Sequence, residues 1–149
     1  MMRKAAVLGL LAAVITVFLA GCGGPRYPEL PADAAAFEMG AYIDEADDDA
    51  GYGVIEYEGR TYMPYGTICR TVQAKDVAAC IGYIVQDGEP LPDTRIYTLA
   101  GDPAHHYLME YYVGTTLMNQ PIFWRATDTW GQEIPTPAYI DGLDYGYWQ

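Results

Sequence analysis

After Gly51 the chain consists of short runs of β-branched and aromatic residues separated by turn residues, and this pattern constrains the fold most strongly. The runs cover residues 54–57, 60–63, 66–72, 81–86, 95–99, 107–113 and 122–127. Short runs separated by turn residues favour antiparallel strands over alternating strands and helices. We therefore predict a mainly β fold, a small antiparallel sandwich or barrel, with one short helix within residues 74–79.

The dipeptide Glu58-Gly59 predicts a two-residue turn between the first two runs. Such a hairpin would set Ile55 opposite Tyr62.

Alternation along the run 107–113 defines two faces of a strand. We expect Tyr107, Met109, Tyr111 and Val113 to face the core, and Leu108, Glu110 and Tyr112 to lie on the other face. The C-terminal stretch 134–149 is rich in aromatic residues, and we expect it to pack on the sheet.

Residues 22–50 are rich in glycine, proline, alanine and aspartate. This composition predicts a flexible tether of about 30 Å, followed by a globular domain at 51–149. A short helix from Ala34 to Ile43, capped by Asp33 and weakened by Gly40, is an alternative for part of the tether.

The first 21 residues have the composition of a secretory signal. Arg3 and Lys4 precede an apolar run of 16 residues, Ala5 to Ala20. The run is short for a membrane span, which needs roughly 20 apolar residues. An uncleaved anchor helix is the alternative.

The four residues Leu19-Ala20-Gly21-Cys22 resemble the lipobox of bacterial lipoproteins. The resemblance implies cleavage before Cys22 and attachment of a palmitate-type lipid to its sulfur. The mature chain would then be exported and anchored to the cell membrane or the outer membrane of the envelope. The later runs RIYTLAGDP, YLMEYYV and MNQPIFWRATDT are similar to those of small bacterial lipoproteins of unknown role.

The charge of the chain disfavours nucleic acid as a partner. Loss of Arg3 and Lys4 with the signal changes the formal net charge from −12 to −14. Such a surface repels phosphate backbones and anionic lipid head groups. Cations and basic partners are attracted instead.

The residue inventory limits the chemistry that the domain can perform. The chain contains no serine, which excludes the Ser-His-Asp hydrolases. We predict no cofactor. Once Cys22 is acylated, Cys69 and Cys80 remain, and the sequence leaves open a disulfide worth about 3 kcal/mol or two buried free thiols.

Two groups of residues are candidates for a metal site. One is His105 and His106 together with Glu110, for which a polar loop after Asp102-Pro103 is the favoured alternative. An EF-hand-like loop starting at Glu45 would bind calcium through Asp47, Asp49 and Glu56, with a solvated acidic linker as the alternative.

Aromatic residues are candidates for a platform on which a glycan stacks, or for the core. They are Trp124, Trp130, Tyr145 and Trp148.

Taken together, these features predict a lipid-anchored envelope domain that is a non-enzymatic module binding a partner protein or an envelope component. The alternatives are a cation- or glycan-binding domain and, third, a hydrolase that uses a pair of carboxylates.

Overall fold

The computed structural model describes residues 25–44, 47–67, 72–114 and 120–140. Its regular structure consists of eight strands and two single-turn 3-10 helices, η1 (Ala74–Asp76) and η2 (Thr127–Thr129). The strands are β1 (Ala35–Glu38), β2 (Gly40–Asp44), β3 (Asp47–Tyr57), β4 (Arg60–Thr67), β5 (Val77–Gln86), β6 (Glu89–Leu99), β7 (Tyr107–Tyr112) and β8 (Ile122–Ala126). Within the described ranges, no helix has the length and apolarity needed to cross a bilayer.

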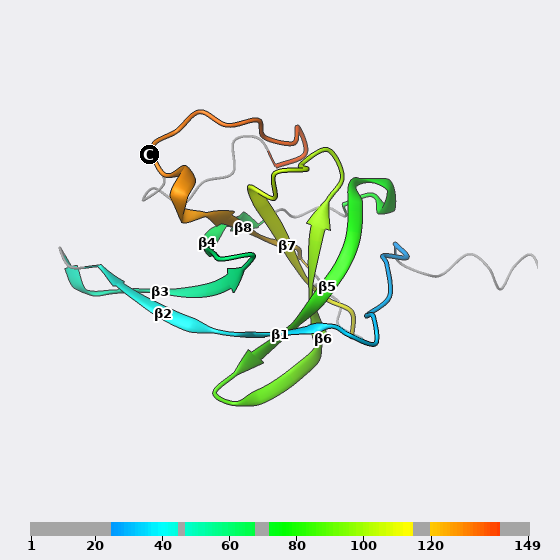
Figure 1. The fold of residues 1–149 in the computed structure, drawn as a ribbon, viewed down its shortest axis with the longest axis horizontal. Helices are drawn as coiled ribbons and strands as arrows, with labels where there is room; N and C mark the ends of the chain where they lie inside the picture. Colours follow the sequence, from blue (N-terminus) through cyan, green and yellow to red (C-terminus); the bar gives the residue numbers. More distant parts are fainter. Residues whose placement is uncertain (1–24, 45–46, 68–71, 115–119, 141–149) are drawn as a thin grey trace, which may run out of the picture.

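The strands form one sheet in the order β1-β5-β6-β7-β8-β4-β3-β2, nearly closed into a barrel (Figure 1). Every pairing is antiparallel except that of β1 with β5. The predicted mainly β class is therefore confirmed, and the architecture is the barrel.

A single stretch of chain joins the two ends of the sheet. β1 pairs with β5, and β2, which follows after Met39, pairs with β3 at the opposite end of the strand order. The Met39 amide donates a 2.9 Å hydrogen bond to the Val85 carbonyl, which extends the contact with β5. Closure requires a glycine at position 82, because a Cβ there would overlap the Ala35 carbonyl and the Phe37 ring.

The barrel interior is filled by large apolar side chains from seven of the eight strands. They are Phe37, Ile55, Tyr62, Ile84, Ile96, Leu108, Trp124 and Ala126, all at most 3% exposed. A filled interior of this kind is a packed core and leaves no channel through the barrel.

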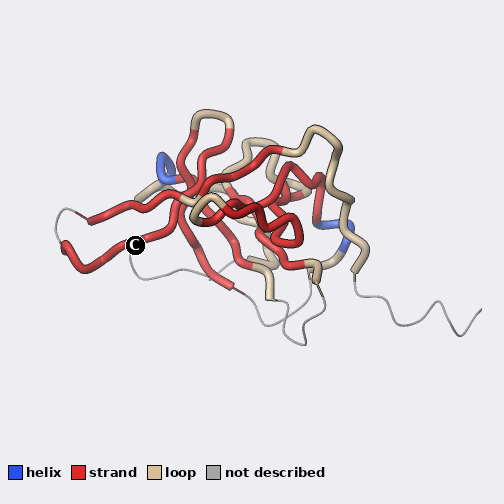
Figure 2. The backbone as a smooth tube through the Cα atoms, turned by 90° about the horizontal axis from the view of Figure 1, so that it is seen from below, coloured by secondary structure: helices blue, strands red, loops and turns tan. Residues whose placement is uncertain are grey.

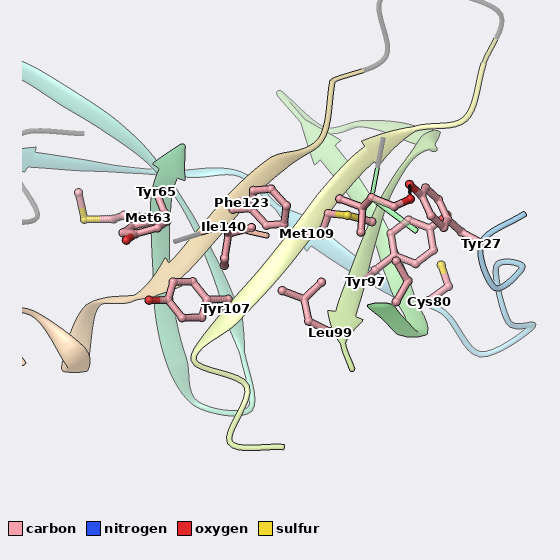
Figure 3. Packing of buried hydrophobic residues seen from close by; sticks show 12 residues of the cluster. Tyr27, Met63, Tyr65, Cys80, Tyr97, Leu99, Tyr107, Met109, Phe123 and Ile140 are labelled. Atoms are coloured by element: carbon pink, nitrogen blue, oxygen red, sulfur yellow. Dashed lines mark hydrogen bonds between the residues drawn. The ribbon is translucent and has the colours of Figure 1, made fainter. Parts of the chain in front are cut away.

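A second buried cluster covers the outer wall of the sheet (Figure 3). Strand residues such as Tyr97, Tyr107 and Met109 pack there against Tyr27 from the N-terminal segment and Ile140 from the C-terminal segment. The expected packing of the C-terminal stretch on the sheet is thus confirmed for residues 134–140, and residues 141–149 lie outside the described ranges.

The hairpin at Glu58-Gly59 is confirmed, with Ile55 opposite Tyr62. Both turn residues have positive φ, 51° and 73°, which suits the right-handed twist of the flanking strands.

The predicted tether is wrong over its described part. Tyr27 and Phe37 are buried, and β1 and β2 belong to the sheet, so the folded domain begins well before Gly51. The alternative helix from Ala34 to Ile43 is also absent, because barrel closure draws this segment into strands and outweighs the helix propensity of its alanines.

The short helix expected within 74–79 is present as the single turn η1, and β5 begins directly after it at Val77. Two smaller expectations need correction. Of the run 66–72, Gly66 and Thr67 are the last residues of β4 and Val72 lies in no strand, whereas residues 68–71 lie outside the described ranges. Both faces of β7 are covered where one was expected, with Leu108 in the barrel interior and Tyr107 and Met109 in the outer cluster.

Two hairpins extend beyond the body of the barrel. The first is the arm, which we define as β2 together with residues 47–54 of β3; it projects sideways in Figure 1 and again in Figure 2. The second hairpin joins β5 to β6, and the exposed first half of β6 contains Pro90 and Pro92. Proline lacks an amide donor, which protects an unpaired strand edge from association.

Candidate functional site

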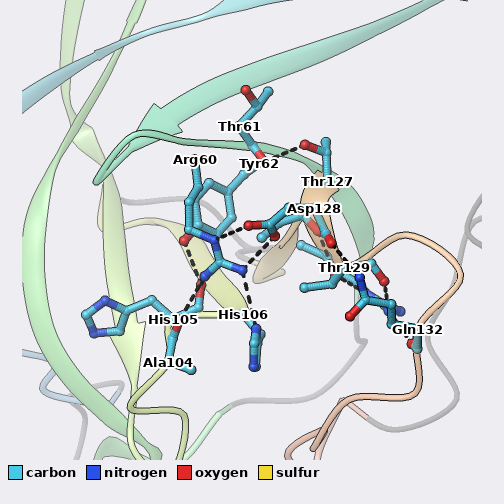
Figure 4. A network of polar contacts seen from close by, with 12 residues as sticks. Arg60, Thr61, Tyr62, Ala104, His105, His106, Thr127, Asp128, Thr129 and Gln132 are labelled. Carbon is cyan, nitrogen blue, oxygen red and sulfur yellow. Dashed lines mark hydrogen bonds and ion pairs between the residues drawn. The ribbon is translucent and has the colours of Figure 1, made fainter.

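The densest polar cluster lies at one rim of the barrel and is centred on Arg60, the first residue of β4 (Figure 4). Its guanidinium binds both carboxylate oxygens of Asp128, through Nε at 2.9 Å and Nη2 at 2.7 Å. Nη1 donates to the carbonyls of Ala104 at 2.7 Å and His105 at 3.0 Å. Arg60 therefore connects the β3–β4 hairpin to η2 and to the loop before β7.

That loop is held in place from both sides. The buried Asp102 carboxylate accepts a 2.8 Å hydrogen bond from the Tyr107 amide, and the His105 amide donates to the Asp102 carbonyl at 3.0 Å. His105 has a positive φ of 49°, a region that a residue with a Cβ seldom adopts. The Tyr62 hydroxyl donates to the His105 carbonyl at 2.6 Å and, with Arg60, fixes this conformation.

The two histidine rings have different neighbours. His105 Nδ1 lies 3.0 Å from a carboxylate oxygen of Glu58, and its ring packs beside Tyr57 with centroids 5.6 Å apart. His106 Nδ1 lies 3.4 Å from Arg60 Nη2. Since a guanidinium only donates, Nδ1 would be the acceptor of a hydrogen bond between these two side chains.

The ionisation of the rim follows from these contacts. The hydrogen bond with His105 lowers the pKa of Glu58, and the hydrogen bonds from Arg60 lower the pKa of Asp128. Burial raises the pKa of Tyr62 to about 12. The rim is thus a set of ion pairs and hydrogen bonds that satisfy one another.

Arg125 on β8 forms a second buried polar centre. Its guanidinium donates to Thr129 Oγ1 and to the carbonyls of Thr129 and Gln132, at 2.9 to 3.0 Å. It also lies over the rings of Tyr65 and Tyr107, 5.5 and 5.9 Å from their centroids. These contacts fix η2 and the start of the C-terminal segment against the outer wall.

Glu110 on β7 is a half-buried carboxylate with apolar neighbours. It lies opposite Ile96 and Ile122, on the inward face of β7. One carboxylate oxygen accepts a 3.0 Å hydrogen bond from Trp124 Nε1. Burial raises the pKa of Glu110, and the Trp124 hydrogen bond offsets only part of that effect.

The metal-site predictions do not lead to a set of ligands. His105 and His106 face Glu58 and Arg60 at the rim, whereas Glu110 binds Trp124. Among the described residues, no three His, Cys, Asp or Glu side chains converge.

The calcium loop is also wrong as a local structure. Residues 47–57 form strand β3, and Glu56 accepts a 2.5 Å hydrogen bond from Thr61. The side chains of Asp47 and Asp49 lie outside what the structure describes.

The aromatic platform is wrong for Trp124, which is 3% exposed in the barrel interior. Trp130 is 42% exposed, just after η2. Tyr145 and Trp148 lie outside the described residues. A stacking surface at the described positions therefore depends on Trp130.

Cys80 carries a free thiol, buried in the outer cluster at 7% exposure. Its sulfur lies 3.8 Å from the Gly82 carbonyl, and burial raises its pKa. Cys80 therefore forms no disulfide with Cys69, in agreement with the alternative of free thiols. Cys69 lies outside the described ranges.

An open groove of about 340 Å³ separates η1 and the loop after β6 from the C-terminal segment. Asp76, Gly101, Pro135, Thr136, Pro137 and Tyr139 are among its lining residues. The Tyr139 hydroxyl donates to the Asp76 carbonyl at 3.3 Å and so connects the two walls. Asp76 is the single charged residue of the lining, so the groove lacks the paired groups that acid-base catalysis needs.

Sequence patterns did not reveal Arg60 or Asp128, which are 68 positions apart. The local signal at Arg60 is its place directly after the Glu58-Gly59 turn, and that signal predicts the hairpin alone. The comparisons with protein-family models, curated proteins and solved structures give no match to the chain.

Proposed function

We propose that the chain is a lipid-anchored envelope protein, acylated on Cys22, whose barrel is a non-enzymatic module that binds a partner protein or an envelope component. The observation that carries the anchor is the sequence Leu19-Ala20-Gly21-Cys22 at the end of a 16-residue apolar run. Acyl chains hold a soluble domain on a bilayer through burial of their CH₂ groups, each worth about 0.8 kcal/mol.

The packing of the barrel interior and the pairing of the rim residues support a binding role. Its interior is filled by apolar groups such as Tyr62 and Trp124, and the rim groups around Arg60 bind one another. Recognition would then take place on the outer surface. With a net charge of −14 after removal of the signal, that surface attracts basic partners.

Metabolic labelling with a palmitate analogue tests the anchor. We expect the wild-type protein to carry the label and Cys22→Ala to lose it. Cys80→Ala is a matched control, which removes a cysteine from the folded domain and should keep the label. Labelling of the Cys22→Ala protein would refute the anchor.

Crosslinking in intact cells tests the binding role. We expect a basic envelope component to crosslink to the wild-type protein, and the adduct to weaken when Cys22→Ala releases the domain from the membrane. Turnover of envelope glycans or peptides by the purified protein would contradict a non-enzymatic role.

A further inference from the structure

The N-terminal segment is fixed to the barrel within a few residues of Cys22. Tyr27 is 7% exposed, and its ring packs edge-on against Tyr97 and Tyr111 with centroids 5.6 and 5.0 Å apart. Its hydroxyl donates a 2.7 Å hydrogen bond to the Val72 carbonyl. Two residues later, Glu29 pairs with Arg95 at 3.1 Å. The outer wall formed by β6 and β7 therefore holds the chain from Tyr27 onward.

The chain between Cys22 and Tyr27 is short. Five peptide steps at full extension span at most about 18 Å, whereas a flexible tether over residues 22–50 would reach about 30 Å. An acyl group on Cys22 would keep the wall around Tyr27 beside the lipid head groups. A long free tether is not available to lift the barrel away.

The arm lies at the opposite end of the molecule. In Figure 1 the blue N-terminal segment that leads into β1 lies to the right of the β1 label, and the arm of β2 and β3 reaches furthest to the left; Figure 2, turned about the horizontal axis, again shows the arm at the left. The pairing of Asp44 with Asp47 is the outermost pair of the arm.

Charge favours the same orientation. The described outer part of the arm contains four aspartates, Asp44 at the end of β2 and Asp47, Asp48 and Asp49 at the start of β3. Anionic lipid head groups repel carboxylates, so the acidic end of the arm is disfavoured at the bilayer surface. The short connection keeps the wall around Tyr27 near the membrane, and repulsion keeps the acidic arm away from it. Both effects therefore favour the same orientation of the barrel.

We propose that the barrel sits directly on the membrane, with the wall around Tyr27 facing the lipid head groups and the β2–β3 arm pointing away from the bilayer. This orientation rests on the proposed acylation of Cys22. It presents the arm, rather than the Tyr27 wall, to partners in the envelope space.

Quenching of a fluorescent label by nitroxide head-group lipids tests the orientation on the full acylated protein. The label is placed on Arg26→Cys or on Ala41→Cys, both at exposed positions, after Cys69 and Cys80 have been replaced by alanine. In vesicles that contain anionic lipid, we expect strong quenching at position 26 and no quenching above background at position 41. A flexible Gly/Ser segment inserted between Gly24 and Pro25 is the control, and it should abolish the quenching at position 26.

The outcomes separate the orientation from the anchor. Intact mass and flotation with vesicles establish acylation first, and a protein without acyl chains would overturn the anchor and the orientation together. Equal quenching at positions 26 and 41 in a protein that is acylated and floats would leave the anchor standing and refute the orientation. Stronger quenching at position 41 would reverse it.

Discussion

Trp124 Nε1 donates a 3.0 Å hydrogen bond to the Glu110 carboxylate on the inward face of the barrel. The contact satisfies the indole, but it leaves a carboxylate among apolar neighbours such as Ile96 and Ile122. The charged form of Glu110 therefore destabilises the folded protein.

Glu110→Gln is expected to stabilise the protein near neutral pH. Because the pKa of Glu110 is raised in the folded state, the folded state binds its proton more tightly than the unfolded state. The stability gained from that proton is complete below the unfolded pKa, about 4.3, and is lost as pH rises through the folded pKa. Glutamine keeps a carbonyl oxygen that accepts the Trp124 hydrogen bond, and it cannot ionise, so it avoids the loss of stability at higher pH.

Thermal unfolding measured from acidic to neutral pH checks this. The melting temperature of Glu110→Gln should exceed that of the wild type near pH 7, and the difference should shrink toward pH 4. The exposed Glu133→Gln is the matched control and should have no such effect. A Glu110→Gln protein less stable than the wild type at pH 7 would contradict the placement of the carboxylate.

Arg60→Ala is expected to destabilise the protein more than Asp128→Asn. The arginine holds the carbonyls of Ala104 and His105, and a polar group that loses its partner costs about 1–3 kcal/mol. The Asp128 side chain is 59% exposed, and exposed ion pairs contribute about 0–1 kcal/mol. Urea unfolding of both variants measures their free energies of unfolding. Equal losses of stability in the two variants would show that the ion pair with Asp128 accounts for the contribution of Arg60.

Gly82→Ala is expected to break the barrel at its parallel pairing. The new Cβ would overlap the Ala35 carbonyl and the Phe37 ring, so β1 must move away from β5. Overpacking of this kind costs about 1–3 kcal/mol. Gly51→Ala is the control, since a Cβ there meets no atom within 4 Å. Comparable stability of the two variants in urea would refute the closure by β1.

Cys80 is expected to react slowly with iodoacetamide in the native protein. Its burial and raised pKa both reduce the thiolate that reacts. Peptide mapping should find Cys80 unlabelled before denaturation and labelled after it, without reductant. If denatured Cys80 is labelled only after reduction, the disulfide with Cys69 is present instead.

Part of the fold was predictable from sequence because its determinants are local. The Glu58-Gly59 turn fixes the register of Ile55 against Tyr62 through the geometry of two residues. The segment 35–44 was predicted wrongly because its strands exist only through pairing with β5 and β3, which lie elsewhere in the chain. Its alanines and acidic residues carry no local sign of burial, and within β1 the one buried residue is Phe37.

The polar rim was likewise predictable only where its determinants are local in the sequence. The loop after Asp102-Pro103 is visible in the sequence, and it does hold His105 and His106. Their partners Glu58 and Arg60 come from a hairpin more than 40 positions away, so the ion pairs depend on the closed barrel. Trp124 was a candidate for an exposed surface because an aromatic residue suits a strand on either face, and only the barrel decides which face is inward.

Acylation of Cys22 is tested most directly by intact mass spectrometry of the protein extracted from its own cell membranes. We predict a chain that begins at Cys22 and carries the mass of a diacylglyceryl group on that residue. A chain that retains residues 1–21, or a mature chain without acyl mass, would refute the lipid anchor.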